Sequence, residues 1–283
     1  MQNNFFVKEP SIISFSGGRT SGYMLYKILQ AHGGILPNYC RVVFCNTGKE
    51  MQQTLDFVND CQKNWGVNID WLELSGVDKH GYKPTENSRD WIFKYRITDY
   101  DNCFKNGEPF ETLINHYNKL PNATNRFCTY LMKQRAIIWY EKINKLVNPT
   151  HILGLRYDEP HRVHRIKARK DNKHHICPLY DEKITNIDVA EFWRKSNFDL
   201  RLIAKNGHTV FGNCDMCFLK GKNQLTHMMR EKKDLADWWI EQEEKTGKTF
   251  KYDISFKELR DKDKKQLKFN FDTEESIDCF CHD

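Results

Sequence analysis

The chain has 283 residues, of which 39% are hydrophobic and 13% aromatic, and this composition excludes a mainly disordered protein. Its 44 Lys and Arg against 38 Asp and Glu give 44 − 38 = +6, a mild surplus that does not demand a polyanionic partner. Because the sequence shows neither a membrane-length apolar run nor a signal-peptide pattern, we expect a cytoplasmic protein with no membrane contact. The ten cysteines then suggest metal ligation, redox chemistry or packing rather than disulfides.

Four short apolar runs are predicted to be strands: 12–15, 42–45, 69–74 and 151–155. Helical patterns follow most of them, and this alternation indicates βα units around a parallel sheet. Apolar side chains share one face of the helix expected after each of the first two runs: Met24, Leu25, Ile28 and Leu29, then Leu55, Val58, Cys61 and Trp65. Just before the second helix, Thr47 and Glu50 are spaced as in a capping box.

Two more helices are predicted farther along the chain. One covers 128–146 and is expected to turn Tyr130, Leu131, Ile137 and Ile138 inward. The other covers 224–245 and is expected to contribute core residues at helical spacing: Leu225, Met228, Met229, Leu235, Trp239 and Ile240. The long Asn- and Asp-rich stretch 75–125 is expected to be an irregular insertion at the functional site.

A glycine-rich turn connects the first predicted strand to its helix, in the run from Ser14 to Gly22 (SFSGGRTSG). Gly17 and Gly18 let the backbone turn tightly and approach an anion, because neither has a Cβ. The first N–H groups and the dipole of the helix favour a phosphate at this place. The spacing matches neither a Walker loop nor a dinucleotide fingerprint. An ordinary strand-to-helix turn is the alternative.

Six motifs in chain order resemble those of phosphoadenosine phosphosulfate (PAPS) reductase-like proteins, in the adenine nucleotide alpha hydrolase superfamily. The run SGGRTS at 16–21 is similar to the Ser-Gly-Gly-x-Asp-Ser pyrophosphate loop, with Thr20 in place of the aspartate. The other matching segments are 46–50 (NTGKE) with 54–58, 126–129 (RFCT) with Lys133, 154–162 (GLRYDEPHR), 178–179 with 188–189, and 212–217 (GNCDMC).

The resemblance implies an α/β enzyme with an open, mostly parallel sheet, helices on both faces, and ATP or a related adenine nucleotide at the carboxyl edge, with Mg²⁺ as a candidate ion. It implies a nucleotide-binding domain over 1–205 and a helical, cysteine-containing appendage over 206–283. Nucleotide binding is expected of Ser14, Ser16, Gly17, Gly18, Arg19, Thr20, Ser21, Asn46, Gly48, Glu50, Gly154 and Arg162. Lys133 and Arg156 are expected to be catalytic, because their cations suit phosphate or sulfate oxygens.

Cys214 and Cys217 have the spacing of a metal-binding pair in a tight turn. The resemblance adds Cys128 as a third ligand, and we expect an iron–sulfur (4Fe–4S) cluster with one open iron. A zinc site completed by Cys103, His208, His227 or a tail cysteine is an alternative, and so is a pair of buried thiols or a redox dithiol. Four other cysteines are interpreted as packing residues: Cys40, Cys45, Cys61 and Cys177.

The end of the chain contains Cys279, Cys281 and His282, which loosely resemble the Glu-Cys-Gly-x-His tail of the reductases. In those proteins the tail thiolate attacks the sulfur of the bound sulfonucleotide, so Cys279 is a candidate nucleophile. A neighbouring cation would lower its pKa. Two alternatives stay open for the thiols of Cys279 and Cys281: they could complete the metal centre as ligands, or they could have no role.

Three functions are consistent with these motifs. The intact Ser-Gly-Gly favours ATP-pyrophosphatase activation with sulfur transfer, whereas the tail favours reduction of adenylyl sulfate or its 3′-phosphorylated form. Thr20 and the basic stretch 161–175 suggest instead a non-catalytic nucleotide-sensing or nucleic-acid-binding regulator. The expected partners are an adenine nucleotide, a sulfur donor or thioredoxin-like reductant, and a second copy of the chain; nucleic acid is not required.

Overall fold

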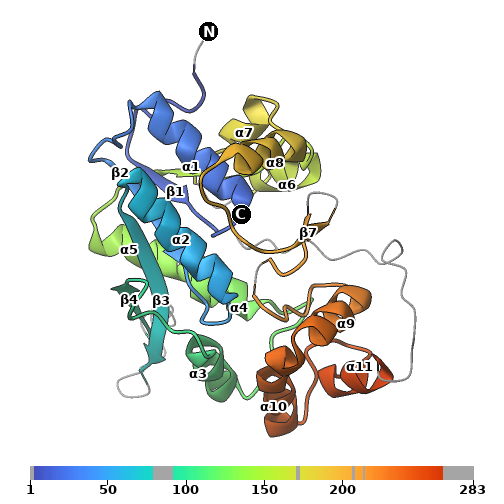
Figure 1. Cartoon of the computed structure of the whole chain (residues 1–283). Coiled ribbons are helices and arrows are strands. Elements are labelled where there is room, and N and C mark those ends of the chain that lie inside the picture. The colour runs from blue at the N-terminus through green and yellow to red at the C-terminus, as the bar shows by residue number, and fades with distance from the viewer. Residues whose placement is uncertain (1–2, 79–91, 170–172, 206–207, 213, 264–283) are drawn as a thin grey trace.

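The fold is built on one six-stranded sheet, seen in a computed structural model that describes residues 3–78, 92–169, 173–205, 208–212 and 214–263. The strand order is β4-β3-β2-β1-β5-β6 (Figure 1). All neighbouring strands are parallel except β3 and β4. The strands are β1 (Ser11–Ser14), β2 (Cys40–Cys45), β3 (Ile69–Val77), β4 (Phe93–Thr98), β5 (Thr150–Ile152) and β6 (His175–Ile176).

Helices cover both faces of this sheet because alternate strand residues point to opposite sides. Ile13 packs in the core with α1 (Arg19–Ala31) and α2 (Gln52–Trp65). Its neighbour Ile12 packs in a second cluster with residues of α5 (Arg135–Ile143). The predicted α/β class, with a mostly parallel sheet between helices, is therefore confirmed.

The stretch from 75 to 125 is more regular than the sequence analysis expected. It contains the edge strand β4 and the helix α3 (Glu108–Tyr117), so the prediction of an irregular insertion was wrong for these parts; residues 79–91 lie outside the described residues. Both elements have the usual patterns. Apolar residues alternate in β4 (FKYRIT), and Phe110, Leu113 and Ile114 form the buried face of α3.

The predicted helix over 128–146 is three segments rather than one. They are α4 (Phe127–Thr129), the π-helix η2 (Tyr130–Gln134) and α5. Leu131 and Ile137 are buried as predicted, but Tyr130 is 48% exposed and Ile138 36% exposed. The inward orientation of these two residues was wrong because the wider π turn changes the angular spacing of the side chains that follow it.

The C-terminal part is helical, as predicted, but the helix expected over 224–245 is interrupted. Lys232 has an extended conformation, with φ −139° and ψ 94°, and it separates α9 (Lys222–Glu231) from the 3₁₀ turn η3 (Lys233–Ala236) and α10 (Asp237–Thr246). Five of the six predicted core residues are buried, and Leu235 is half-buried. Trp239 stacks on Phe256 of α11 (Phe256–Asp263), with ring centroids 5.9 Å apart.

Short elements fill the chain between β5 and these C-terminal helices, apart from the edge strand β6. They are α6 (Pro160–Lys167), α7 (Pro178–Asp181), α8 (Asn186–Lys195) and the ribbon of β7 (Ala204–Lys205) with β8 (His208–Thr209). The predicted domain boundary after residue 205 falls within this ribbon and stays a prediction. None of the described helices is long and apolar enough to span a membrane.

Candidate nucleotide and thiol site

Three predicted motifs meet at one edge of the sheet. The parallel strands β1, β2 and β5 lie side by side, so the segments that follow their carboxyl ends lie at the same edge. These segments are the phosphate loop (residues 16–21), the second-strand motif (residues 46–50) and the stretch from Gly154 to Arg156. In the sheet, β2 lies on one side of β1 and β5 lies on its other side. The phosphate loop therefore lies at the point where the strand order reverses.

The phosphate loop is closed by its own hydroxyl groups. The Ser21 hydroxyl accepts a hydrogen bond from the Ser16 backbone N–H at 3.1 Å and donates to the Gly18 carbonyl oxygen at 3.0 Å. Gly17 has a φ of +78°, and a Cβ at this residue would lie 2.7 Å from Thr54 Cγ2. The loop thus needs glycine at position 17 both for its backbone conformation and for its packing.

Two more predicted nucleotide-binding residues are Ser14, just before this loop, and Arg19, within it. The Ser14 hydroxyl oxygen is buried at the end of β1 and has no hydrogen-bond partner among the described residues, which leaves it available to a ligand. The Arg19 guanidinium instead forms a two-point ion pair with Asp199, with a distance of 2.7 Å from Nε to Oδ1. Its charge is therefore already balanced within the protein.

Arg156 connects the segment after β5 to the phosphate loop. Its Nη1 donates to the Thr20 hydroxyl oxygen at 2.9 Å, and its Nε lies 3.0 Å from Asp158 Oδ1. Glu159 accepts hydrogen bonds from the Arg156 backbone N–H and from Arg162. A Cβ on Gly154 would approach Ser21 Cα to 3.1 Å, so glycine at position 154 permits this close approach. The structure thus brings Arg156 to Thr20, and Glu159 joins Arg156 to Arg162.

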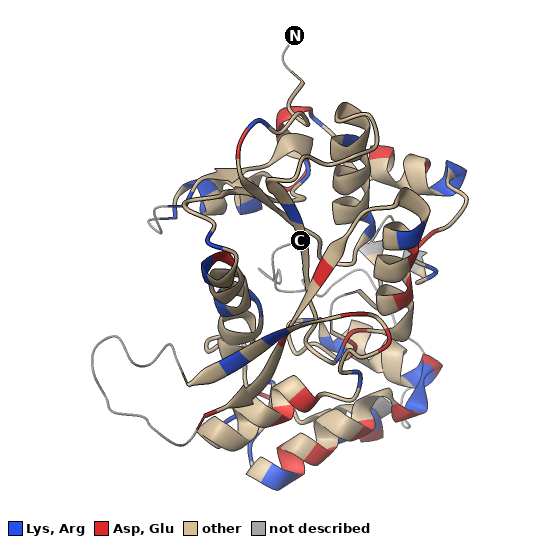
Figure 2. Ribbon diagram, turned by 90° about the vertical axis from the view of Figure 1, so that its left-hand side faces the viewer, with Lys and Arg blue, Asp and Glu red and all other residues tan. Residues whose placement is uncertain are grey.

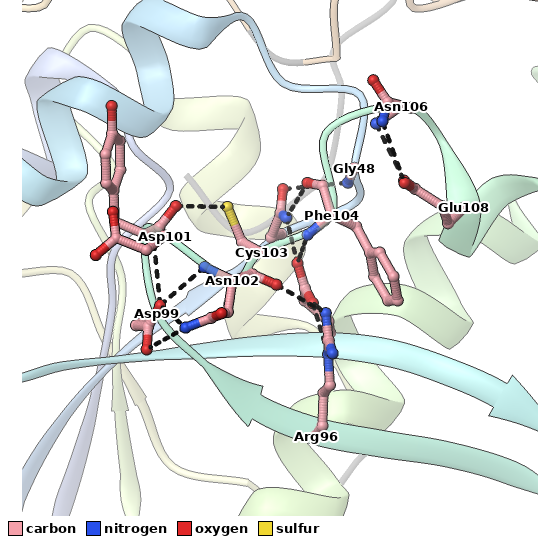
Figure 3. Close-up of polar contacts among 12 residues, drawn as sticks. Gly48, Arg96, Asp99, Asp101, Asn102, Cys103, Phe104, Asn106 and Glu108 are labelled. Carbon is pink, nitrogen blue, oxygen red and sulfur yellow. Dashed lines mark hydrogen bonds and ion pairs between the residues drawn. The ribbon is translucent and has the colours of Figure 1, made fainter.

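A buried carboxylate that the sequence analysis missed shapes the second-strand motif. Glu73 of β3 accepts hydrogen bonds from Asn46 Nδ2, from the Phe104 backbone N–H at 2.7 Å and from Arg96 at 2.8 and 3.0 Å (Figure 3). Asn46 Oδ1 in turn accepts from the Gly48 N–H at 3.1 Å. Burial raises the pKa of the Glu73 carboxyl, and these donors act in the opposite direction. A glutamate inside an apolar strand run was the available sequence signal.

Thr47 and Glu50 make one of the two contacts of a capping box, and they do not begin a helix. Both the Thr47 backbone N–H and its hydroxyl donate to the Glu50 carboxylate, at 2.9 and 2.8 Å. The helix α2 starts later, at Gln52, with Met51 as its N-cap. Burial raises the pKa of the Glu50 carboxyl, and the charge of nearby Lys133 lowers it. Lys133, predicted to be catalytic, belongs to the π-helix η2 and lies close enough to the second-strand motif for its charge to act on Glu50.

The Cys-x-x-Cys turn packs directly on this motif. Thr47 Oγ1 lies 3.4 Å from Cys214 Sγ, and Glu50 and Cys214 form an antiparallel bridge. Asp215, the next residue, forms a buried ion pair with Lys49 at 2.9 Å. Its carboxylate also accepts a hydrogen bond from Trp239 Nε1 at 2.7 Å. The ion pair and this hydrogen bond join the sheet domain to the helix α10.

The cysteines predicted to bind a metal are all buried: Cys128, Cys214 and Cys217. Within the described part of the chain, no three His, Cys, Asp or Glu side chains are grouped so that they could hold a metal ion. The described donors alone therefore do not fit a cluster or a zinc site. The tail residues Cys279, Cys281 and His282 lie outside the described residues, and so does the side chain of His208.

The remaining cysteines are surrounded by protein. Burial raises the pKa of Cys40 and Cys103 to about 11 and that of Cys177 to about 12. The pKa of Cys61 is raised further by the same cause. These four thiols are protonated at neutral pH and have little nucleophilic character. For Cys40, Cys61 and Cys177 this agrees with the interpretation as packing residues.

A family model described as the phosphoadenosine phosphosulfate reductase domain matches residues 10–218. The chain belongs to this phosphoadenosine phosphosulfate reductase domain family. The matched region includes the phosphate loop, the second-strand motif and both cysteines of the Cys-x-x-Cys turn, and it ends before α9. The chain is also similar to the uncharacterized nin region protein ORF290 of Escherichia phage lambda. The two are 26% identical over 217 residues, which cover 76% of this chain and 68% of that protein.

Proposed function

We propose that the chain binds an adenine nucleotide at the phosphate loop and performs ATP-pyrophosphatase-type activation followed by sulfur transfer. The observation that supports this most is the contact of Arg156 Nη1 with Thr20. It places a guanidinium beside the N-terminus of α1, where backbone N–H groups and the helix dipole already favour phosphate oxygens. The unpartnered hydroxyl of Ser14 adds a polar group at the same edge.

The proposed reaction has two displacements. An acceptor oxygen attacks the α-phosphorus of ATP, the bond from that phosphorus to the bridging oxygen breaks, and pyrophosphate leaves. A hydrosulfide donor then attacks the activated carbon of the acceptor, the bond from that carbon to oxygen breaks, and AMP leaves with the oxygen. Arg156 is proposed to stabilise charge on the phosphates during the first displacement, with Lys133 as a second cation near the Cys214 turn.

The family match supports a second candidate, reduction of a sulfonucleotide. In this reaction the Cys279 thiolate would attack the sulfur of adenylyl sulfate or its 3′-phosphorylated form. The bond from that sulfur to the bridging oxygen would break, AMP or its 3′-phosphorylated form would leave, and an S-sulfocysteine would remain. A thioredoxin-like dithiol would then release sulfite and restore the thiol. Cys279 lies outside the described residues, so this candidate rests on the family and the tail sequence.

Product analysis tests the two candidates on one preparation. The purified chain is incubated with ATP and Mg²⁺, and separately with each sulfonucleotide and a thioredoxin-like reductant. AMP with pyrophosphate supports activation, and sulfite supports reduction. Tight ATP binding with neither product contradicts both and favours the nucleotide-sensing regulator.

The metal centre stays a prediction of the family resemblance, with Cys128, Cys214 and Cys217 as ligands and iron–sulfur preferred to zinc. An absorbance spectrum of anaerobically purified chain tests it. A broad visible band that disappears in Cys214→Ser but persists in Cys61→Ser supports the cluster, because Cys61 is fully buried within α2. Colourless protein with bound zinc supports the alternative, and metal-free protein contradicts both.

A further inference from the structure

A cavity of about 690 Å³ lies between the second-strand motif and the C-terminal helices. Lys49 and Asp215 form one side of it, and residues around the break between α9 and α10 form the other. Among the residues that the structure describes, none from the phosphate loop contributes to its lining. The volume is in the range of small-molecule sites, roughly 300–1,000 Å³. The cavity is thus large enough for a ligand. It borders the second-strand motif at Lys49 but, within the described chain, is not lined by the phosphate loop.

The charges of this cavity favour an anion. Asp215 is neutralised by Lys49, and its carboxylate also accepts two N–H donors, from Trp239 and Met216. The remaining lining charges are three cations and two carboxylates: Arg230, Lys232, Lys233, Glu231 and Asp234. The two lysines are exposed. Adjacent exposed lysines provide the point charges that bind phosphate oxygens. Elsewhere, the view in Figure 2 shows basic and acidic segments interspersed.

The wall of the cavity also carries a fixed aromatic ring, Trp238. The indole is half-buried and packs against Gly107, where a Cβ would come within 2.6 Å of Trp238 Cε2. Phe110 lies edge-on to it, with ring centroids 5.9 Å apart. The Lys49 ammonium lies 4.9 Å from the centroid of the ring. These neighbours hold the indole in place. A ligand ring that contacts it would therefore cost little side-chain entropy at Trp238.

We propose that this cavity binds a nucleotide unit, with its base against Trp238 and its phosphate near Lys232 and Lys233. Aromatic side chains beside cationic side chains are the combination that binds nucleotides without sequence preference. The unit is either a free nucleotide or one residue of a single-stranded nucleic acid. The site goes beyond the proposed function, since it requires no turnover at the phosphate loop. Through Asp215, a ligand here lies next to the Cys214 turn.

Binding of a labelled oligothymidylate to the full chain, measured by fluorescence anisotropy, tests the proposal. Thymidine monophosphate serves as the competitor. Neither probe contains adenine, so the phosphate loop is not the expected binding site. We expect Lys232→Glu/Lys233→Glu to raise Kd at least tenfold and Trp238→Leu to raise it about tenfold. The matched control is Lys257→Glu/Lys262→Glu, because both lysines are exposed on α11 and do not line the cavity; its Kd should stay within twofold.

The outcomes separate the two ligand sources and separate this site from the proposed function. Competition by thymidine monophosphate indicates a free nucleotide, and its failure to compete indicates a strand. The proposal is overturned if neither probe binds the unmodified chain, or if the Lys232→Glu/Lys233→Glu variant, folded by circular dichroism, binds as well as the control. A chain that binds oligothymidylate but releases neither AMP nor sulfite would retain this site and lose the proposed function.

Discussion

The phosphate loop and the Cys214 turn lie at the same end of the sheet, but they are held in different ways. The loop is closed by contacts between residues at most five positions apart, such as Ser16 with Ser21. The Cys214 turn depends on residues far along the chain, with Thr47 being 167 positions away. The hydrogen bonds that close the loop are therefore local, although Gly17 also packs on Thr54 and Arg156 also reaches Thr20. The Cys214 turn is held by the second-strand motif and by Trp239 of α10.

The largest loss of stability is expected from Asp215→Ala, which removes the ion pair between the Cys214 turn and Lys49. Removal of this carboxylate leaves the buried Lys49 ammonium without its partner and should lower the free energy of unfolding by about 3–5 kcal/mol. Urea denaturation followed by circular dichroism measures the change.

The control for this prediction removes both charges. Replacement of a buried ion pair by apolar residues is often close to neutral, but Asp215→Leu also removes the acceptor of the buried Trp239 Nε1–H. Lys49→Met/Asp215→Leu should therefore recover part of the stability lost by Asp215→Ala and fall short of the unmodified chain by about 1–3 kcal/mol. A loss below about 1 kcal/mol in Asp215→Ala would show that this pair does not hold the turn.

The next effect in size is expected from Gly17→Ala, which strains the local structure. The substitution adds a Cβ at a positive φ and within 2.7 Å of Thr54 Cγ2, so it should cost about 2–4 kcal/mol. Gly33→Ala is the matched control, since Gly33 has a φ of +67° but nothing within 4 Å of the added Cβ. Equal losses in the two variants would contradict the packing part of the argument.

A smaller effect is expected on nucleotide affinity. Arg156→Ala removes the guanidinium beside Thr20, and the loss of a charged hydrogen bond of about 1.5–3 kcal/mol should weaken ATP binding about tenfold or more. Arg19→Ala should change the ATP Kd less than threefold, because the Arg19 guanidinium is held by Asp199 and the Leu202 carbonyl. The Arg156 guanidinium is also paired, with Asp158, but its Nη1 reaches Thr20 of the phosphate loop. Isothermal titration calorimetry compares them, and a reversed order would identify Arg19 as the residue that binds phosphate.

The smallest effect is expected from Trp239→Phe, which removes a single hydrogen bond to Asp215. The carboxylate keeps Lys49 and the Met216 N–H, so the loss should be about 1–2 kcal/mol. The same urea titration measures it. A loss as large as that of Asp215→Ala would mean that the indole N–H, rather than the ion pair, holds the two parts together.

The difference between local contacts and contacts far apart in the chain also explains what the sequence could predict. The strands β1, β2 and β3, the phosphate loop and the contact of Thr47 with Glu50 are all visible as local patterns. Glu73 and Asp215 were missed because their partners come from other parts of the chain, and local spacing contains no information about those pairs. Tyr130 and Ile138 were assigned the wrong orientation because a π turn has no strong signature in a single sequence.

The hydroxyl of Ser21 has a consequence for ligand binding. It fixes the loop through bonds to Ser16 and Gly18 that involve no ligand, so a phosphate group meets N–H donors that are already ordered. Little conformational entropy is then lost on association, and the gain in affinity comes from preorganisation. Ser21, which is among the predicted nucleotide-binding residues, would in this way tighten phosphate binding through the order that it gives the loop.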